Sequence, residues 1–196
     1  MENVRNVCDI YNKKRTIYNY KRIVIDGMAD IKKFSVILAK HEGGFVNDPY
    51  DKGGATNKGV TLSVYQSFYG KDKTAEDLKK ITDEQYNHIL KVGYWDKCKA
   101  DYINNQSLAN IFVDMAYNSG CVTAIKKMQG VIGVVVDGLI GTKTLNAINN
   151  GNQESIFNKF KQVRIDYYNN IVKRNPTQKK FLNGWLKRVN SYKFQN

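Results

Sequence analysis

Apolar residues recur at helical spacing along most of the chain. The first clear pattern follows Asp30, a suitable N-cap, and Gly43-Gly44 predicts its end, so Glu42 is expected in or just after the last turn. Ser107 and Thr177 stand where we expect the N-caps of two later helices. The same periodicity predicts further helices over residues 61–69, 75–80, 82–91, 107–117, 122–131, 142–148, 153–173 and 177–192.

One segment departs from the helical pattern. Between residues 46 and 60, turn residues alternate with short extended pieces. Asp48-Pro49 and the pair Gly53-Gly54 there predict a small β-hairpin or an irregular loop. We therefore predict a mainly α fold with one small β-hairpin beside the helix that leads to Glu42.

The chain of 196 residues is long enough for one domain with a sizeable core, or for a main domain with a small appendage. Residues 1–29 lack a clear period, and we interpret them as an N-terminal arm. They contain no apolar run of signal-peptide length, and no stretch of the sequence approaches a membrane span. We expect no stable membrane insertion, and cytoplasmic synthesis with release or non-standard export if the protein acts outside the cytoplasm.

The strongest bulk feature is charge, because 31 Lys and Arg residues against 18 Asp and Glu residues give a formal net charge of +13. Such an excess predicts an anionic partner, and nucleic acid, anionic lipid and acidic cell-wall polymer all qualify. The sequence shows neither a helix-turn-helix signature nor an aromatic RNA-binding strand, so we expect no nucleic acid as partner.

The three cysteines, Cys8, Cys98 and Cys121, are widely spaced and form no CxxC pair. No histidine stands close enough in sequence to build a zinc site with them, and we expect neither a metal nor a cofactor. We interpret the cysteines as small buried or surface thiols, and a single disulfide with one thiol left over is the alternative.

Residues 41–60 hold the candidate catalytic groups. Glycoside hydrolysis needs a carboxylic acid to protonate the leaving oxygen and usually a second carboxylate. Apolar neighbours and the negative end of the helix dipole would raise the pKa of Glu42, as a general acid requires. Asp51 is our first choice for the second group and Asp48 our second, while Thr56 could help to hold the attacking water.

Each of these residues also has a structural interpretation. Glu42 could be a solvated charge at a helix end. Asp48, before a proline, is typical of a residue that starts a turn, and Thr56 could bond only to the backbone of the hairpin.

Four residues are candidates for binding a sugar. Tyr94 and Trp95 could provide a flat aromatic face for stacking, although a tryptophan after a helix end is also typical of a core. Asn118 could bond to an N-acetyl group or to water, and its structural alternative is a helix C-cap. Asp48 is the fourth candidate, at the turn of the hairpin segment.

Residues 42–61 resemble the signature of the glycoside hydrolase family 108 lysozymes, which are N-acetylmuramidases; in this chain the segment begins with Glu42-Gly43-Gly44. Residues 114–120 are similar to the central-helix motif of that family. Residues 136–145 resemble the core of its C-terminal peptidoglycan-binding region. The resemblance spans roughly residues 30–193.

This resemblance implies a lysozyme-like helical fold in which Glu42 is the catalytic acid. It implies a catalytic domain over residues 30–120 and a helical peptidoglycan-binding region over residues 121–196. We expect the two to pack closely, because no linker separates them. The implied reaction cleaves the β-1,4 bond between N-acetylmuramic acid and N-acetylglucosamine in glycan strands of the bacterial cell wall, and we expect a monomer.

The chain is also similar to the phage-type lysozymes, whose active-site trio is Glu, Asp and Thr. Eight residues separate Glu42 from Asp51 as in those enzymes, whereas the four between Asp51 and Thr56 are one fewer. The resemblance therefore implies the acid role for Glu42 and leaves the roles of Asp51 and Thr56 open.

Two other functions stay open at this stage. A non-catalytic wall-binding or secretion-assisting protein could use the same cleft, and the region after residue 120, to hold glycan without cutting it. A nucleic-acid binder is supported by charge alone. If the chain is a hydrolase in which water attacks directly, inversion is expected, and the carboxyl groups of Glu42 and Asp51 should lie ~6.5–9.5 Å apart.

Overall fold

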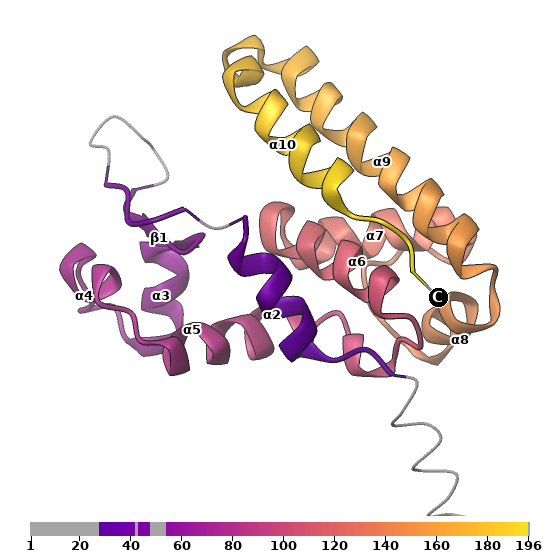
Figure 1. Ribbon diagram of the computed structural model, residues 1–196, viewed down its shortest axis with the longest axis horizontal. Helices are drawn as coiled ribbons and strands as arrows, with labels where there is room; N and C mark the ends of the chain where they lie inside the picture. Colours follow the sequence, from indigo (N-terminus) through magenta and orange to yellow (C-terminus); the bar gives the residue numbers. More distant parts are fainter. Residues whose placement is uncertain (1–27, 42, 48–53, 196) are drawn as a thin grey trace, which may run out of the picture.

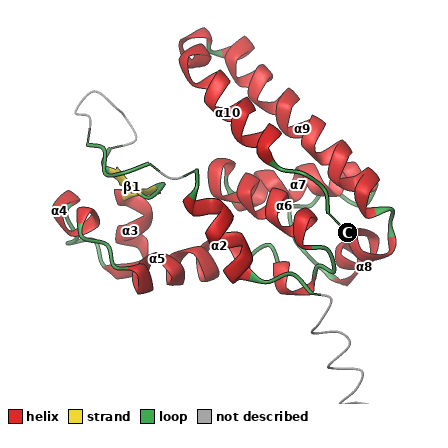
Figure 2. Cartoon of the chain, in the orientation of Figure 1, coloured by secondary structure: helices red, strands yellow, loops and turns green. Residues whose placement is uncertain are grey.

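The computed structural model describes residues 28–41, 43–47 and 54–195 (Figure 1). The fold is mainly α with one small antiparallel hairpin, as the sequence predicts (Figure 2). The helices are α2 (Ile31–Ala39), α3 (Leu62–Tyr69), α4 (Ala75–Lys79), α5 (Asp83–Leu90), α6 (Gln106–Ser119), α7 (Cys121–Ile132), α8 (Thr142–Asn150), α9 (Gln153–Arg174) and α10 (Lys179–Ser191). The strands are β1 (Thr56–Asn57) and β2 (Val60–Thr61), and the short helical turns are η1 (Lys91–Trp95), η2 (Ala100–Tyr102) and η3 (Pro176–Gln178).

Helix α6 runs through the middle of the molecule (Figure 1), and every residue from Ser107 to Ala116 is buried. A helix without a solvent-facing side needs neighbours all around it, and α2, α7, α9 and η1 pack against α6. Its N-cap is Asn105, whose side chain accepts a hydrogen bond from the backbone N–H of Leu108. The prediction of Ser107 as N-cap is wrong, because its hydroxyl accepts instead from the backbone N–H of Gln195.

The hairpin lies with α3, α4 and α5 in a lobe on one side of α2 (Figure 1). Thr56 pairs with Thr61 across the two strands, and Val46 forms a further antiparallel bridge to Thr56. Lys58 and Gly59 form the two-residue turn, both with positive φ, which suits the right-handed twist of a tight hairpin. The small hairpin that the sequence predicts is therefore present, in a segment whose residues 48–53 lie outside the described ones.

The long helices α9 and α10 lie side by side on the opposite flank of the molecule (Figure 1), where α9 also packs against α6 and α7. Asn175 and Pro176 end α9, and the Asn175 side chain caps η3 by accepting from the backbone N–H of Thr177. The prediction of Thr177 as the N-cap of the last helix is therefore wrong, because α10 begins only at Lys179.

A buried ion-pair triad joins α6, α9 and α10. The Asp114 carboxylate accepts from Arg164 Nη2 at 2.7 Å, and from Nε and Nη2 of Arg188 at 3.0 and 2.7 Å. Burial alone would raise the pKa of Asp114, but the two arginine charges and their hydrogen bonds outweigh it and hold the pKa below its usual value. The triad thus ties the central helix to both C-terminal helices.

The described residues at the N-terminal end pack against the body. All of the predicted arm except its last two residues lies outside the described part of the chain. Ala29 is buried, and its backbone N–H donates to the carbonyl of Ile103 at 2.9 Å. Among the described helices, none combines the length and the apolar character needed to cross a bilayer.

Candidate functional site

The C-terminal end of α2 leads into the candidate site. Asp30 caps the start of the helix, as predicted, by accepting from the backbone N–H of Lys32 at 2.8 Å. The helix ends at Ala39, and the backbone N–H of His41 donates to the carbonyl of Leu38. The chain then passes through two exposed glycines to the bridge that pairs it with β1. Glu42 itself, like Asp48 and Asp51, lies outside the described residues.

A cavity of about 540 Å³ opens beside Gly43 and Gly44, a size typical of ligand sites. A Cβ atom at either glycine would meet no atom within 4 Å, so packing does not require glycine here. The pair instead leaves the wall next to position 42 bare. The cavity is lined by α2, the hairpin and α5, through Ser35, Val36, Ala39, Gly43, Gly44, Asn57, Lys58, Asp83, Tyr86 and Asn87.

A charged pair stands in this cavity. Lys58 Nζ lies 2.7 Å from Asp83 Oδ1, and the Lys58 hydrogen bond and charge lower the pKa of that carboxyl. The backbone of Lys58 is fixed from behind, because Tyr117 Oη on α6 donates to its carbonyl at 2.7 Å. The cavity therefore offers an ionised carboxylate and an ammonium group, both suited to hydrogen bonding with sugar hydroxyls.

Sequence reasoning missed these cavity residues. Lys58 was visible only as part of a turn next to a glycine, and Asp83 only as the first residue of a helix after Thr82. The signal available in the sequence was Lys58-Gly59 between two short extended pieces. A residue followed by glycine at such a place favours a two-residue hairpin turn.

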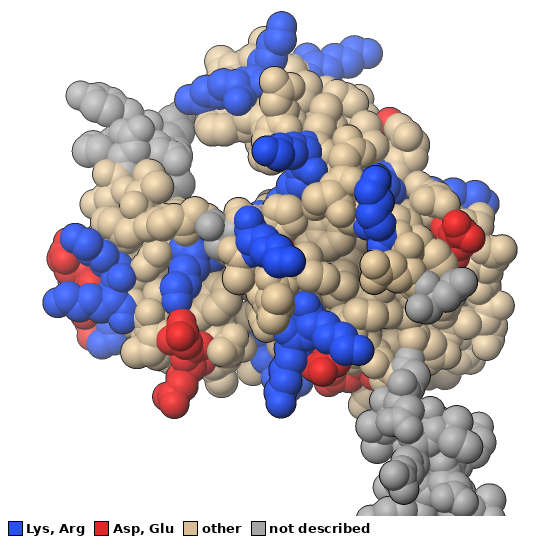
Figure 3. Space-filling model, viewed as in Figure 1, with Lys and Arg blue, Asp and Glu red and all other residues tan. Residues whose placement is uncertain are grey.

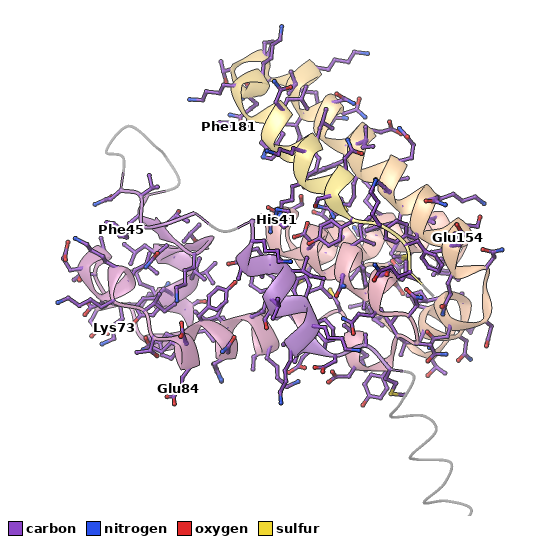
Figure 4. All side chains as sticks on the ribbon, in the orientation of Figure 1. His41, Phe45, Lys73, Glu84, Glu154 and Phe181 are labelled. Carbon is purple, nitrogen blue, oxygen red and sulfur yellow. The ribbon has the colours of Figure 1, made fainter. Side chains whose placement is uncertain are left out.

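A hollow separates the hairpin lobe from α10, and basic side chains stand on its α10 side (Figure 3). His41 lies at the base of this hollow, with Phe45 on the hairpin side and Phe181 on α10 (Figure 4). His41 Nε2 and Ser191 Oγ are 3.1 Å apart, so the residue before Glu42 is bonded to the end of α10. Burial, and then the charge of Arg188, lowers the pKa of His41 and so favours the neutral ring.

Thr56 is the predicted catalytic residue that the structure describes. It is half-buried in β1, and both backbone groups bond to Val46, each at 2.8 Å. Its neighbour Asn57 lines the cavity, but the Asn57 amide donates to the carbonyls of Leu78 and Lys79 and so holds the end of α4. Thr56 is thus adjacent in sequence to a cavity residue, while its own backbone is held by Val46.

The predicted aromatic residues lie away from this cavity. Trp95 is fully buried, its ring centroid is 5.7 Å from that of Phe34, and its Nε1 donates to Asp101. No face of the Trp95 ring is left for a sugar, so the core interpretation fits the structure. Tyr94 packs with its ring centroid 4.8 Å from that of Tyr117 and lines a different cavity.

Asn118 is exposed near the end of α6, and its amide donates to the carbonyl of Asp114 at 2.7 Å. This bond runs back along the helix, whose C-cap is Gly120. Of the described site candidates, none lines the cavity, and Thr56 comes nearest along the chain, one residue before Asn57. Among the residues it describes, no group of three or more His, Cys, Asp or Glu side chains could hold a metal ion.

Comparisons with known proteins show what the chain is similar to. Residues 35–120 match the family model for glycosyl hydrolase 108, and residues 123–190 match the model described as a predicted peptidoglycan domain. Among solved structures, SagA from Brucella abortus is similar with a TM-score of 0.73 and 31% sequence identity, over 83% of this chain and 92% of that chain. A comparison with curated proteins found no match.

Proposed function

Because the chain belongs to the glycosyl hydrolase 108 family, we propose that it is a lysozyme that cleaves the β-1,4 bond between N-acetylmuramic acid and N-acetylglucosamine, with Glu42 as general acid. The observation that carries this proposal is the open cavity beside Gly43 and Gly44, directly after Glu42 in the sequence. Charged and polar side chains line that cavity, and the lysozyme-like fold leads α2 into it.

The proposed chemistry starts with proton transfer. The Glu42 carboxylic acid gives its proton to the glycosidic oxygen as the bond to the sugar breaks and positive charge develops on the ring. Asp51 stays ionised, and with Thr56 it holds the attacking water or stabilises that charge. The cavity beside the glycine pair receives the sugar, and Lys58 and Asp83 bond to its hydroxyl groups.

In this proposal the C-terminal region binds the cell wall. We propose that residues 30–120 form the catalytic domain, and that residues 121–196 bind peptidoglycan while packed against it. The net charge of +13 draws the protein to an anionic cell wall, and this attraction weakens as salt screens it.

The test is digestion of purified peptidoglycan with mass analysis of the released fragments. Wild type should release muropeptides that end in reducing muramic acid. Glu42→Gln should lose at least about 100-fold in rate, because it removes the proton donor. Glu154→Gln, an exposed change at the start of α9, is the matched control and should keep full activity. A Glu42→Gln protein that clears the wall at the wild-type rate would refute the proposal.

Two further variants test whether Asp51 or Asp83 is the second carboxylate of the reaction. Asp51→Asn should lose most of the activity, whereas Asp83→Asn, which breaks the pair with Lys58, should mainly raise the substrate concentration needed for half-maximal rate. The opposite pattern would assign the second carboxylate to Asp83. Binding of insoluble peptidoglycan by wild type with no soluble fragments would instead support the non-catalytic wall-binding protein.

A further inference from the structure

Two of the three cysteines meet at the junction between the parts matched by the two family models. Cys98 is fully buried in the turn after η1, and Cys121 is the first residue of α7. Cys121 Sγ lies 3.4 Å from the carbonyl oxygen of Gly93, and the backbone N–H of Cys98 donates to the next carbonyl, that of Tyr94, at 3.0 Å. The two cysteines, with 22 residues between them in the sequence, therefore meet at the same turn, and each thiol affects the pKa of the other. The third cysteine, Cys8, lies outside the described residues.

One thiol of the pair can be reached from solvent. Cys121 is half-buried and lines a second cavity of about 410 Å³, together with Gly93, Tyr94 and Lys97. Cys98, in contrast, has no exposed surface. A small oxidant therefore meets Cys121 first, with Cys98 directly behind it.

We propose that Cys121 and Cys98 form a two-thiol redox site, in which Cys121 attacks a hydroperoxide and Cys98 then closes an intramolecular disulfide. With a hydroperoxide, the Cys121 thiolate displaces the alcohol or water and becomes a sulfenic acid. Cys98 sulfur then attacks Cys121 sulfur and water leaves. Two thiols and one peroxide thus give one disulfide, one water and one water or alcohol.

The surroundings favour this order of events. The neighbouring Cys98 thiol, followed by the charge of Lys97 and the first backbone N–H of α7, lowers the pKa of Cys121 to about 7. The neighbouring Cys121, and then burial, raise the pKa of Cys98 well above its usual value. Against this, the protonated Cys121 thiol can donate to the Gly93 carbonyl at 3.4 Å, which favours the thiol form. The thiolate is the nucleophile, so Cys121 attacks first and Cys98 resolves.

The closed disulfide would join the turn after η1 to α7, and so bond the catalytic part covalently to the wall-binding part. Such a bond persists in an oxidising compartment and is rare in the cytosol. With the proposed function, the protein is made in the cytosol and acts at the cell wall outside it. The cysteine pair would therefore be reduced on synthesis and oxidised at the cell wall.

The test uses the full chain with Cys8→Ser, so that only the pair remains. After treatment with hydrogen peroxide and then an alkylating maleimide, intact mass should show the loss of two hydrogen atoms and no maleimide. Peptide mapping should find Cys98 joined to Cys121 within one chain. Before oxidation, alkylation of Cys121 should be half-maximal near pH 7. Two remaining alkylatable thiols after peroxide, or only intermolecular disulfides, would overturn the proposal.

Single replacements separate the two roles in the same background. With Cys98→Ser, peroxide should leave Cys121 as a sulfenic acid that a dimedone probe captures. With Cys121→Ser, Cys98 should resist both peroxide and maleimide until the chain is denatured. Equal reactivity of the two cysteines in the native chain would contradict the order of attack. The readout is mass, so it is independent of whether the protein hydrolyses peptidoglycan.

Discussion

Replacement of Asp114 by Asn should be among the most destabilising changes in the molecule. The Asp114 carboxylate and the Arg164 guanidinium are both fully buried, and Arg188 is largely so. The Asn side chain would keep one acceptor oxygen, but its amide nitrogen would face arginine donors, and the fully buried Arg164 guanidinium would lose the carboxylate it is paired with. A buried charge left without its partner is the main cost of breaking such a pair.

The expected loss is about 3–5 kcal/mol in the free energy of unfolding, the range for removing one partner of a buried ion pair. At this chain length each kcal/mol lowers the Tm by about 2–4 °C, so the fall should be about 6–20 °C. Urea denaturation followed by circular dichroism gives the free energy directly. Asp166→Asn is the matched control, because Asp166 is exposed on α9, where its carboxylate accepts a hydrogen bond from Gln162. It should change the free energy by less than about 0.5 kcal/mol. An Asp114→Asn loss below about 1 kcal/mol would refute the reasoning.

The same triad predicts how stability depends on pH. The pKa of Asp114 is lower in the folded chain than in the unfolded chain, where it is about 3.9. Its contribution is therefore complete above that unfolded value and is lost as the pH falls through the folded value. Asp114→Asn should flatten the fall of stability below about pH 4. An unchanged acid profile in the variant would show that other carboxylates dominate acid unfolding.

Three further changes should lower the free energy of unfolding in urea. Gln129→Ala leaves the buried N–H of Gly138 without its acceptor, removes the bonds to exposed Asp137 and Leu139, and should cost about 1–3 kcal/mol. Thr82→Ala removes the capping box with Gln85 at the start of α5 and should cost about 1 kcal/mol. Trp95→Ala empties a fully buried site and should cost about 3–5 kcal/mol. A loss near zero for Trp95→Ala would contradict its place in the core.

Helical periodicity was sufficient to predict the fold class and most of the helices, because each helix buries one face and so repeats its apolar residues. The N-caps of α6 and α10 were harder. Asn105 and Ser107 are both good capping residues, and only the bond from Ser107 to Gln195, 88 positions away, decides between them. A local pattern carries no information about such a distant partner.

The candidate site, too, was predictable from the sequence only in part. The glycine pair was enough to predict where the first helix ends, and the structure places a cavity beside that pair. Trp95 could not be assigned from sequence, because a tryptophan after a helix end suits a sugar-binding wall and a core equally well. Trp95 packs against Phe34 on α2, a residue far from it in the sequence, and a local pattern does not reveal such a contact. The charged pair of Lys58 and Asp83 needed the hairpin and α5 to be placed together.

The shared triad also limits how this chain can be divided. A fragment that ended at Gly120 would keep Asp114 and lose Arg164, Arg188 and the Ser191 partner of His41. The shortened protein would carry an acid without counter-charge in its interior, and the segment before Glu42 would lose an anchor. A C-terminal segment taken from another protein should therefore replace residues 121–196 only if it supplies two arginines at the positions of Arg164 and Arg188. We expect the regions before and after Gly120 to be inherited together for this reason.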